Sequence, residues 1–307
     1  MIIVDVILLA IGFTLLTRGA DYFIDNAAAF AEDKGITPHV VGVTIVAFGT
    51  SLPELLVSLL SSYQGYNDLA LGNIVGSNIS NIGLVLATSC FIFFYILNSN
   101  IVPEKDANSD SYVMLLAVIL LYFLAQDKVI SSAEGAMFFG LYIIYMVWLY
   151  QRSLGVDVES EEKESASYPL LVGGLVALLF GAQLTVDSAV GIATFMGISE
   201  VVIGLSVVAI GTSLPELAGT VSAARKGHKE IAVGNVIGSN IANIFLVMGV
   251  LAIVKPILVD ELILVTTMPL LIIITIATFA MIRVPMNRFS GAILFGFFGL
   301  FIYQLTL

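Results

Sequence analysis

Two glutamates inside long apolar stretches, Glu54 and Glu216, are the residues of this chain best suited to chemistry. Each ends the same six-residue motif, Gly-Thr-Ser-Leu-Pro-Glu. A carboxylate within a membrane is unfavourable by about 2.5 to 3.5 kcal/mol on insertion scales, so its presence there indicates function. Pro53 and Pro215 lack an N–H and leave a backbone carbonyl beside each carboxylate without its helical partner. Because oxygen ligands suit hard cations, the two motifs predict a cation site where membrane helices are interrupted.

The same motifs allow a structural interpretation. Ser-x-x-Glu is the signature of a capping box, in which Ser51 with Glu54, and Ser213 with Glu216, would satisfy the free N–H groups at the start of a helix. A cap in mid-membrane still requires an interrupted helix, so both interpretations can hold together.

The composition of the chain is that of a membrane protein. Of its 307 residues, 59% are hydrophobic and 11% are charged, which predicts an all-α polytopic membrane protein in contact with the lipid bilayer. The net charge of −11 and the lack of a basic patch exclude a nucleic-acid partner. The single cysteine, Cys90, excludes an internal disulfide and a thiolate metal cluster.

Apolar runs separated by polar breaks predict ten membrane spans, with about 20 residues per crossing as the guide. The first and sixth are long, which implies tilt, and the fourth is short. The N-terminal stretch carries Asp5 and has no basic residue before its apolar run, so it is expected to be a membrane helix and not a signal peptide. The spans are placed at residues 2–31, 39–64, 69–97, 111–126, 130–150, 168–196, 200–224, 230–254, 261–282 and 289–307.

The two halves of the chain are copies of one another. Gly211 follows Gly49 by 162 positions, and the same offset aligns residues 19–81 with the second half without a gap. A copy of five spans crosses the membrane an odd number of times, so consecutive copies must face opposite ways. We therefore expect ten transmembrane helices as two inverted five-helix repeats, residues 1–151 and 168–307, joined by an acidic linker at 152–167.

The basic residues predict the orientation, because lysine and arginine concentrate in cytoplasmic loops. The loops on one side carry nine of them, and those on the other side carry only Lys128 and Lys255. This places both termini outside the cell membrane and the central linker in the cytoplasm. The nine are Lys34, Lys105, Arg152, Lys163, Arg225, Lys226, Lys229, Arg283 and Arg288.

A second pair of motifs, Gly-Asn-x-x-Gly-Ser-Asn-x-x-Asn, spans residues 72–81 and 234–243. The small residue before the last asparagine is serine in the first copy and alanine in the second. Small residues recur every four positions, a spacing that lets membrane helices approach closely. A neighbouring polar stripe either lines the site or forms hydrogen bonds between helices. We assign to the site the members that end the stripe, Ser77, Asn81, Ser239 and Asn243, and leave both alternatives open for Asn73, Asn78, Asn235 and Asn240.

These paired motifs resemble the alpha repeats of the calcium/cation antiporter superfamily, and look most similar to those of prokaryotic sodium/calcium exchangers. The resemblance covers nearly the whole chain, with the alpha motifs at residues 39–86 and 201–248. It implies an electrogenic antiporter that exchanges about three sodium ions for one calcium ion at a midplane site by alternating access. No cofactor and no obligatory protein partner are expected, and a monomer suffices because both half-sites lie in one chain.

Carried over position by position, the resemblance implies a role for each motif residue. Glu54 and Glu216 would coordinate calcium directly, and Asn81 and Asn243 would complete the central position. Thr50 and Thr212 would add oxygens, chiefly from the backbone, and the flanking sodium sites would involve Ala47, Ser51, Ala209 and Ser213. Some relatives, including the potassium-dependent branch, have aspartate at the position of Asn243, so potassium dependence is not expected here.

The charge of the site suggests how two ions would be coupled. Two carboxylates are neutralised by one calcium ion or by two sodium ions, and a third sodium ion adds a surplus positive charge. Moving that charge across the membrane is worth about 2.3 kcal/mol per 100 mV. If both ions need the same two glutamates, they exclude each other, and this exclusion couples their transport.

Three other functions are compatible with acidic residues in a membrane. An intramembrane enzyme would need an acid and a base in different environments, whereas a duplication provides two copies of one environment. A channel would need an open path, usually at a ring of equivalent segments. Calcium/proton or other divalent cation/proton antiport remains the alternative within transport, since glutamates can carry protons.

The remaining polar residues are assigned structural roles. Arg18 and Asp21 lie three positions apart and are expected to pair locally. Asp25 and its counterpart Asp187, near helix ends, are expected to snorkel or to tie loops together and not to bind ions. His39 and His228 lack metal-ligand spacing and are expected at the surface.

Overall fold

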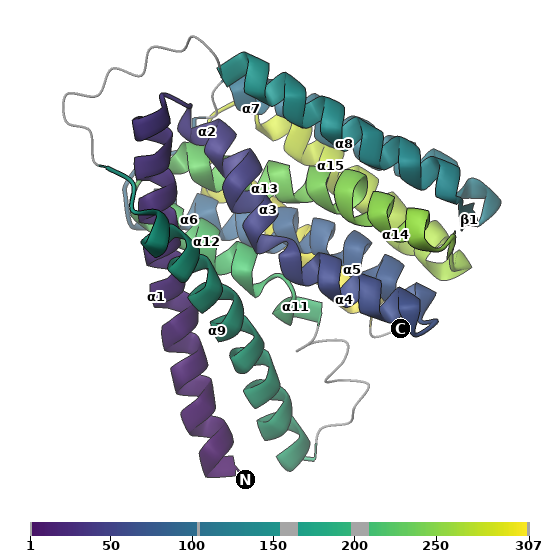
Figure 1. Ribbon diagram of the computed structural model, residues 1–307, viewed down its shortest axis with the longest axis horizontal. Helices are drawn as coiled ribbons and strands as arrows, with labels where there is room; N and C mark the ends of the chain where they lie inside the picture. The colour runs from purple at the N-terminus through teal and green to yellow at the C-terminus, as the bar shows by residue number, and fades with distance from the viewer. Residues whose placement is uncertain (1, 103–104, 154–164, 198–208, 306–307) are drawn as a thin grey trace.

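The computed structural model describes residues 2–102, 105–153, 165–197 and 209–305, which are almost entirely helical (Figure 1). Seven stretches are long and apolar enough to cross a membrane, and two further helices bent by 41° form an eighth candidate span. The described residues also contain one two-stranded antiparallel sheet, β1 (Val129–Ile130) with β2 (Ile257–Leu258). The prediction of an all-α polytopic membrane protein is thereby confirmed.

Eight of the ten predicted spans coincide with these candidates. The seven single stretches are Ile2–Lys34, Leu69–Tyr95, Lys105–Asp127, Ser132–Ser153, Tyr168–Phe195, Lys229–Val254 and Ile263–Met281, and the bent pair is Pro38–Thr50 with Leu52–Tyr63. The tenth predicted span matches α16 (Arg288–Gln304), which has 17 residues. The seventh, 200–224, is described only as α11 (Ala209–Gly211) and α12 (Leu214–Arg225). Its first part lies outside the described residues, as do positions 154–164 of the predicted linker.

The prediction of a short fourth span is wrong. α7 (Lys105–Leu124) begins six residues before the predicted start and has 20 residues. The polar residues at its start precede the expected span, but Asp110 is fully buried there. It accepts hydrogen bonds from Arg152 at the end of α8 (Ser132–Ser153). The Asp110 carboxylate, which lies before the predicted span, is thus buried among the helices and paired with a cation.

The duplication in the sequence is also a duplication of local structure. α4 (Leu52–Tyr63) and α12 begin and end 162 residues apart, and so do α5 (Asn67–Ser80) and α13 (Lys229–Ala242). π-Helical segments follow at the same offset, η2 (Asn81–Leu86) and η5 (Asn243–Met248). The turns correspond as well, because Gly65 and Gly227 both adopt positive φ.

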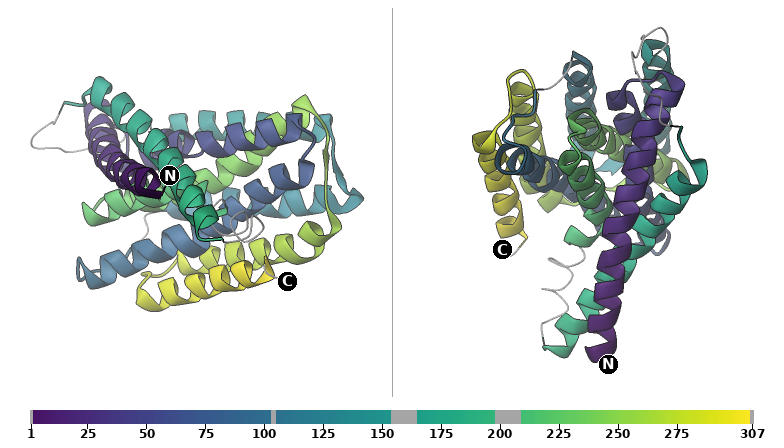
Figure 2. Two further views of the ribbon diagram at one scale, coloured as in Figure 1. Left: turned by 90° about the horizontal axis from the view of Figure 1, so that it is seen from below. Right: turned by 90° about the vertical axis from the view of Figure 1, so that its left-hand side faces the viewer.

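α1 (Ile2–Lys34) and α9 (Tyr168–Phe195) lie side by side and extend beyond the remaining helices (Figures 1 and 2). They run antiparallel and touch through glycines. A Cβ on Gly19 would come within 2.3 Å of the Leu178 nitrogen, and a Cβ on Gly181 within 2.3 Å of the Leu16 nitrogen. Gly19 and Gly181 are repeat-matched, so the two helices use the same residue to approach each other.

The centre of the molecule is formed by the two helices that carry the second motif. In their most apolar windows, 83% of the residues of Lys229–Val254 and 78% of those of Leu69–Tyr95 are buried, against 39% or less in the other single-helix spans. A Cβ on Gly238 would lie 2.4 Å from the Val43 carbonyl oxygen in η1 (Gly42–Val46). The small-residue face predicted for α13 therefore packs as expected. The segment matched to η1, 204–208, lies outside the described residues.

The remaining elements include α6 (Ala87–Tyr95) and α14 (Gly249–Val254), which complete the two central stretches. The others are α2 (Pro38–Val41), α3 (Ala47–Thr50), η3 (Ala125–Asp127), η6 (Ile263–Thr267) and α15 (Met268–Met281).

Candidate functional site

The two motif glutamates lie just after breaks between helices. α3 ends at Thr50, Ser51 has a non-helical backbone, and α4 then begins with Pro53 in its first turn. α11, Ser213 and α12 repeat this arrangement. The break follows from the prolines, which cannot donate to the preceding turn. It places each glutamate in the first turn of a new helix.

The capping-box interpretation is wrong for both serines. Neither Ser51 nor Ser213 makes a side-chain cap to the helix that follows it. Ser51 Oγ instead donates to Glu216 Oε1 of the other copy, at 3.1 Å. The hydroxyl expected to stabilise its own helix therefore joins the two copies at the site.

The carboxylates of Glu54 and Glu216 are fully buried and close enough to interact electrostatically. Both oxygens of Glu54 and Oε2 of Glu216 have no hydrogen-bond partner among the described residues. Buried carboxylates without partners are strongly unfavourable, and two of them facing each other are more so. A bound cation would offset both the burial of the unpartnered carboxylates and their mutual repulsion.

Neutral oxygens without partners lie on the second-motif helices. Ser77 and Asn81 are buried and unpartnered within the described chain, and Asn243 has a free Oδ1. Asn81 and Asn243 are the first residues of the π-helical segments, which occur frequently at functional sites. Ser239 differs, because its Oγ donates to Asn235 Oδ1 in the preceding turn of its own helix, at 3.5 Å.

The asparagines left open at the sequence level mainly join helices. Asn73 Nδ2 donates to Ser58 Oγ at 2.9 Å, and Asn235 Nδ2 donates to Thr220 Oγ1 at the matched positions, at 2.8 Å. Asn235 Oδ1 also accepts from Thr50 Oγ1 at 3.2 Å. These bonds hold the broken helices against the central ones.

Asn78, which the sequence allows either to line the site or to join helices, forms hydrogen bonds between the two copies. Its Oδ1 accepts from Asn243 Nδ2 at 3.2 Å, and its own Nδ2 donates to the Asn240 carbonyl at 3.4 Å. This contact orients the Asn243 amide and leaves its Oδ1 free. The motif indicated a polar residue here, but pairing across the two copies could only be read from their packing.

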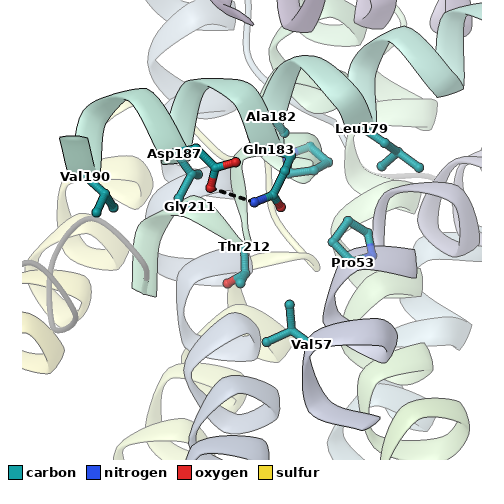
Figure 3. A pocket seen from close by; sticks show the side chains of 11 residues that line it. Pro53, Val57, Leu179, Ala182, Gln183, Asp187, Val190, Gly211 and Thr212 are labelled. Atoms are coloured by element: carbon teal, nitrogen blue, oxygen red, sulfur yellow. Dashed lines mark hydrogen bonds between the residues drawn. The ribbon is translucent and has the colours of Figure 1, made fainter. Parts of the chain in front are cut away.

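The remaining predicted residues occupy different positions. Ala47 packs next to Gly238 of α13. Thr50 is fully buried, whereas Thr212 lines a cavity of about 320 Å³ between α4, α9 and α11 with α12. Figure 3 shows this cavity, with Asp187 bonded to Gln183 on its wall. Ala209 begins α11, at the edge of the described residues.

The prediction that His39 lies at the surface is wrong. His39 is 1% exposed, and its Nε2 lies 2.8 Å from Asp110 Oδ2. Arg152 binds the same carboxylate through two nitrogens, at 2.8 and 3.1 Å. The three residues come from α2, α7 and α8, so the pairing depends on contacts distant in sequence. No local pattern around His39 signals it.

The expected local pair of Arg18 with Asp21 is also wrong. Asp21 Oδ1 accepts from Ser222 Oγ of α12 at 2.6 Å, and Arg18 is exposed. Asp25 joins two elements, since it pairs with Lys226 at 2.6 Å, whereas Asp187 accepts a hydrogen bond from Gln183 of its own helix. Among the described residues, no group of three or more His, Cys, Asp or Glu side chains is placed to hold a metal, so a cation here would rely on two carboxylates and neutral oxygens.

Comparisons with known proteins agree with the motifs. The family model described as sodium/calcium exchanger protein matches residues 4–151 and 166–307. The sodium/calcium exchanger MaX1 of Methanosarcina acetivorans is 33% identical, covering 99% of both chains. The putative antiporter CaxA of Alkalimonas amylolytica is 37% identical over 84% of this chain and 83% of its own. A structure of the sodium-calcium exchanger NCX_Mj soaked with Na⁺ and Sr²⁺ is similar at a TM-score of 0.88 and 33% identity, covering 99% of both chains.

Proposed function

This chain belongs to the sodium/calcium exchanger family and is a sodium/calcium antiporter, a transporter and not an enzyme, and we propose that both ions compete for the buried oxygens around Glu54 and Glu216. The observation that carries this proposal is the set of unpartnered oxygens on two facing carboxylates and on the asparagine and serine side chains beside them. Calcium binds carboxylate, carbonyl and amide oxygens. This chemistry matches the set.

The proposed ligands follow the two motifs. Glu54 and Glu216 coordinate calcium, with Asn81 and Asn243 completing the central position. Backbone oxygens freed at the helix breaks beside Thr50 and Thr212 add to this set, together with Ser77 and Ser239. The flanking sodium positions are formed at Ala47, Ser51, Ala209 and Ser213. Ser51 already donates to Glu216, and a sodium ion bound there would replace that hydrogen bond.

We further propose that residues 1–151 and 168–307 are inverted five-helix repeats, joined by the linker at 152–167. Within the two alpha motifs, 39–86 and 201–248, α4, α5 and η2 start and end 162 residues before α12, α13 and η5. α1 and α9 meet antiparallel through the matched pair Gly19 and Gly181. Matched helices that run in opposite directions are what an inverted duplication requires, and such repeats commonly support alternating access around a midplane site.

Exchange is proposed to be electrogenic and coupled by exclusion. One calcium ion neutralises the two carboxylates, and so do two sodium ions, whereas a third sodium ion adds one positive charge. Since neither ion set can bind without Glu54 and Glu216, the two cannot occupy the site together. Access would change only once the buried charge is neutralised, because two bare carboxylates are costly to enclose.

The chain is proposed to lie in the cell membrane with both termini outside and the linker in the cytoplasm. Two observations support this arrangement. At the start of α8, β1 pairs with β2 and so brings together the loops that contain Lys128 and Lys255. In the last turn of α8, Arg152 pairs with Asp106. The basic and the poorly basic loops therefore gather at opposite ends of α8, as the positive-inside rule requires. A monomer is proposed, as both halves of the site belong to one chain.

Sodium-gradient uptake tests the site. Proteoliposomes loaded with sodium are diluted into sodium-free buffer with radiolabelled calcium, using wild type, Glu54→Gln, Glu216→Gln and the control Glu261→Gln, an exposed carboxylate paired with Lys128. Wild type and control should take up calcium, and the two site variants should not. Uptake by either site variant at the wild-type rate would refute the assignment.

Electrogenicity is tested in the same vesicles. Three sodium ions leaving for one calcium ion entering moves positive charge outward, so an inside-positive potassium diffusion potential set with valinomycin should accelerate uptake. An inside-negative potential should slow it. Equal rates at both potentials would show electroneutral exchange.

A further inference from the structure

α1 is fastened to α12 by a group of polar contacts on one side of the molecule. Ser222 Oγ donates to Asp21 Oδ1 at 2.6 Å, one turn before Lys226 Nζ meets Asp25 Oδ1 at 2.6 Å. The same Lys226 Nζ donates to the backbone oxygen of Asp21 at 2.8 Å. These four residues, which we call the α1–α12 latch, join two helices from different copies of the duplication.

The matched positions in the other copy cannot form this latch. At an offset of 162 residues, Asp21 and Asp25 correspond to Gln183 and Asp187 on α9, and Ser222 and Lys226 correspond to Leu60 and Gln64 at the end of α4. The cation of the latch is thus replaced by a neutral amide. The Asp187 carboxylate bonds to Gln183 of its own helix, at 2.8 Å.

The helices also pack more closely at the latch than at the matched position in the other copy. α1 packs along α12, whereas a cavity of about 320 Å³ lies between α9 and α4, lined by Asp187 and Gln183 on one wall and by Pro53 and Val57 on another (Figure 3). The side with the latch is closed and the matched side is open. Thr212, next to the second helix break, also lines this cavity, so the open side leads toward the site.

We propose that the α1–α12 latch biases the exchanger toward the conformation in which the cavity beside Asp187 is open and the Lys226 side is closed. This inference rests on the alternating access put forward above. In a perfectly duplicated chain, the two access conformations would exchange the environments of the two copies and have equal free energy. A difference in charge pairing between matched positions breaks that equality.

The expected size of the bias is modest. Partly exposed ion pairs of this kind shift an equilibrium constant by up to about fivefold. A shift of that size is sufficient to change the populations of two conformations that are otherwise similar in free energy, and it leaves the helix packing intact.

Thiol labelling from water can report both sides. Val186 lines the cavity, and its matched residue Ile24 is wholly buried on the side of the latch. Ile24→Cys and Val186→Cys are each placed in a Cys90→Ala background, reconstituted in sodium-free nanodiscs and reacted with a charged maleimide. Nanodiscs expose both faces, so the labelling rate follows the fraction of time each side is open.

Two latch variants and one control variant are compared in each background. Lys226→Gln should raise labelling of the Ile24→Cys protein about fivefold and lower that of the Val186→Cys protein. Lys226→Arg, which keeps the charge, should restore the original rates. Lys229→Gln removes the same charge from a neighbouring lysine whose partner is the adjacent Glu230, and should leave both rates unchanged.

Two results would overturn the proposal in distinguishable ways. If Ile24→Cys is labelled but Lys226→Gln changes its rate no more than Lys229→Gln does, the latch has no influence on access. If Ile24→Cys is never labelled, in any variant and with sodium or calcium present, alternating access itself is refuted and the latch falls with it. Ion uptake is not needed for either readout.

Discussion

The antiparallel contact of α1 and α9 makes a sharp prediction about a single methyl group. A Cβ on Gly181 would lie 2.3 Å from the Leu16 nitrogen and 2.8 Å from the Gly12 oxygen. Both are main-chain atoms and cannot rotate away. Gly181→Ala must therefore push the two helices apart along their contact, and overpacking of this kind costs about 1 to 3 kcal/mol.

Gly173→Ala provides the matched control on the same helix. Gly173 is exposed, and apart from its chain neighbours and its own helix backbone no described heavy atom lies within 4 Å of a Cβ placed there. It should gain about 1 kcal/mol from the better helix propensity of alanine. Because Gly181→Ala receives the same gain, the difference between the two variants isolates the clash at about 1 to 3 kcal/mol.

The repeat relation adds a second requirement. Gly19→Ala meets the Leu178 nitrogen, also at 2.3 Å, and should be destabilising by the same amount as Gly181→Ala. Once the helices have separated for one alanine, the second fits more easily, so the double variant should cost less than the sum of the single ones. Reversible unfolding in detergent, followed by denaturant titration, measures all four proteins. Gly181→Ala as stable as Gly173→Ala, or strict additivity in the double variant, would refute the reasoning.

Three further predictions concern polar groups. Asp110→Asn should lower the free energy of unfolding by about 3 to 5 kcal/mol, because Arg152 and His39 lose a buried charged acceptor; denaturant titration checks this, and sodium-dependent calcium uptake by the folded fraction should persist. Asn78→Ala should weaken calcium affinity about tenfold, since the Asn243 amide loses the acceptor that orients it; the calcium concentration giving half-maximal uptake measures this, and an unchanged value would contradict it. Calcium uptake at equal pH on both sides should fall on acidification, because the site carboxylates must be ionised to bind the ion; raising calcium should restore it, and inhibition that ignores calcium would contradict competition at the site.

Much of the architecture could be predicted from the sequence because it depends on local residue chemistry and on the duplication of the chain. Glu54 and Glu216 stand out since a carboxylate in an apolar run is rare, and Pro53 breaks its helix whatever surrounds it. The offset of 162 residues predicted a duplication, and α4 and α12, like α5 and α13, begin and end at that offset. The four-residue spacing of Gly234 and Gly238 likewise predicted a close helix contact.

The errors share one physical cause, the choice of partner by a polar side chain. The residues around His39 lack the spacing of metal ligands, which predicts a surface position. His39 is instead buried and pairs with Asp110, 71 positions away. Ser51 matched a local capping pattern, in which its Oγ would accept from a backbone N–H, but its hydroxyl donates to Glu216 of the other copy. That partner lies 165 positions away, so the residues around Ser51 do not indicate it.

The sequence by itself determined the membrane class, the duplication, the broken helices and the identity of the two carboxylates, because each depends on composition, periodicity or backbone chemistry within a few residues. Only the tertiary structure decided which oxygens are left without partners, which helices meet through glycine, and which side is closed. Asp25 and Asp187, for example, are the same residue type at matched positions of the two copies. Their environments differ because Lys226 and Gln64 lie at the matched positions of the helices that α1 and α9 face.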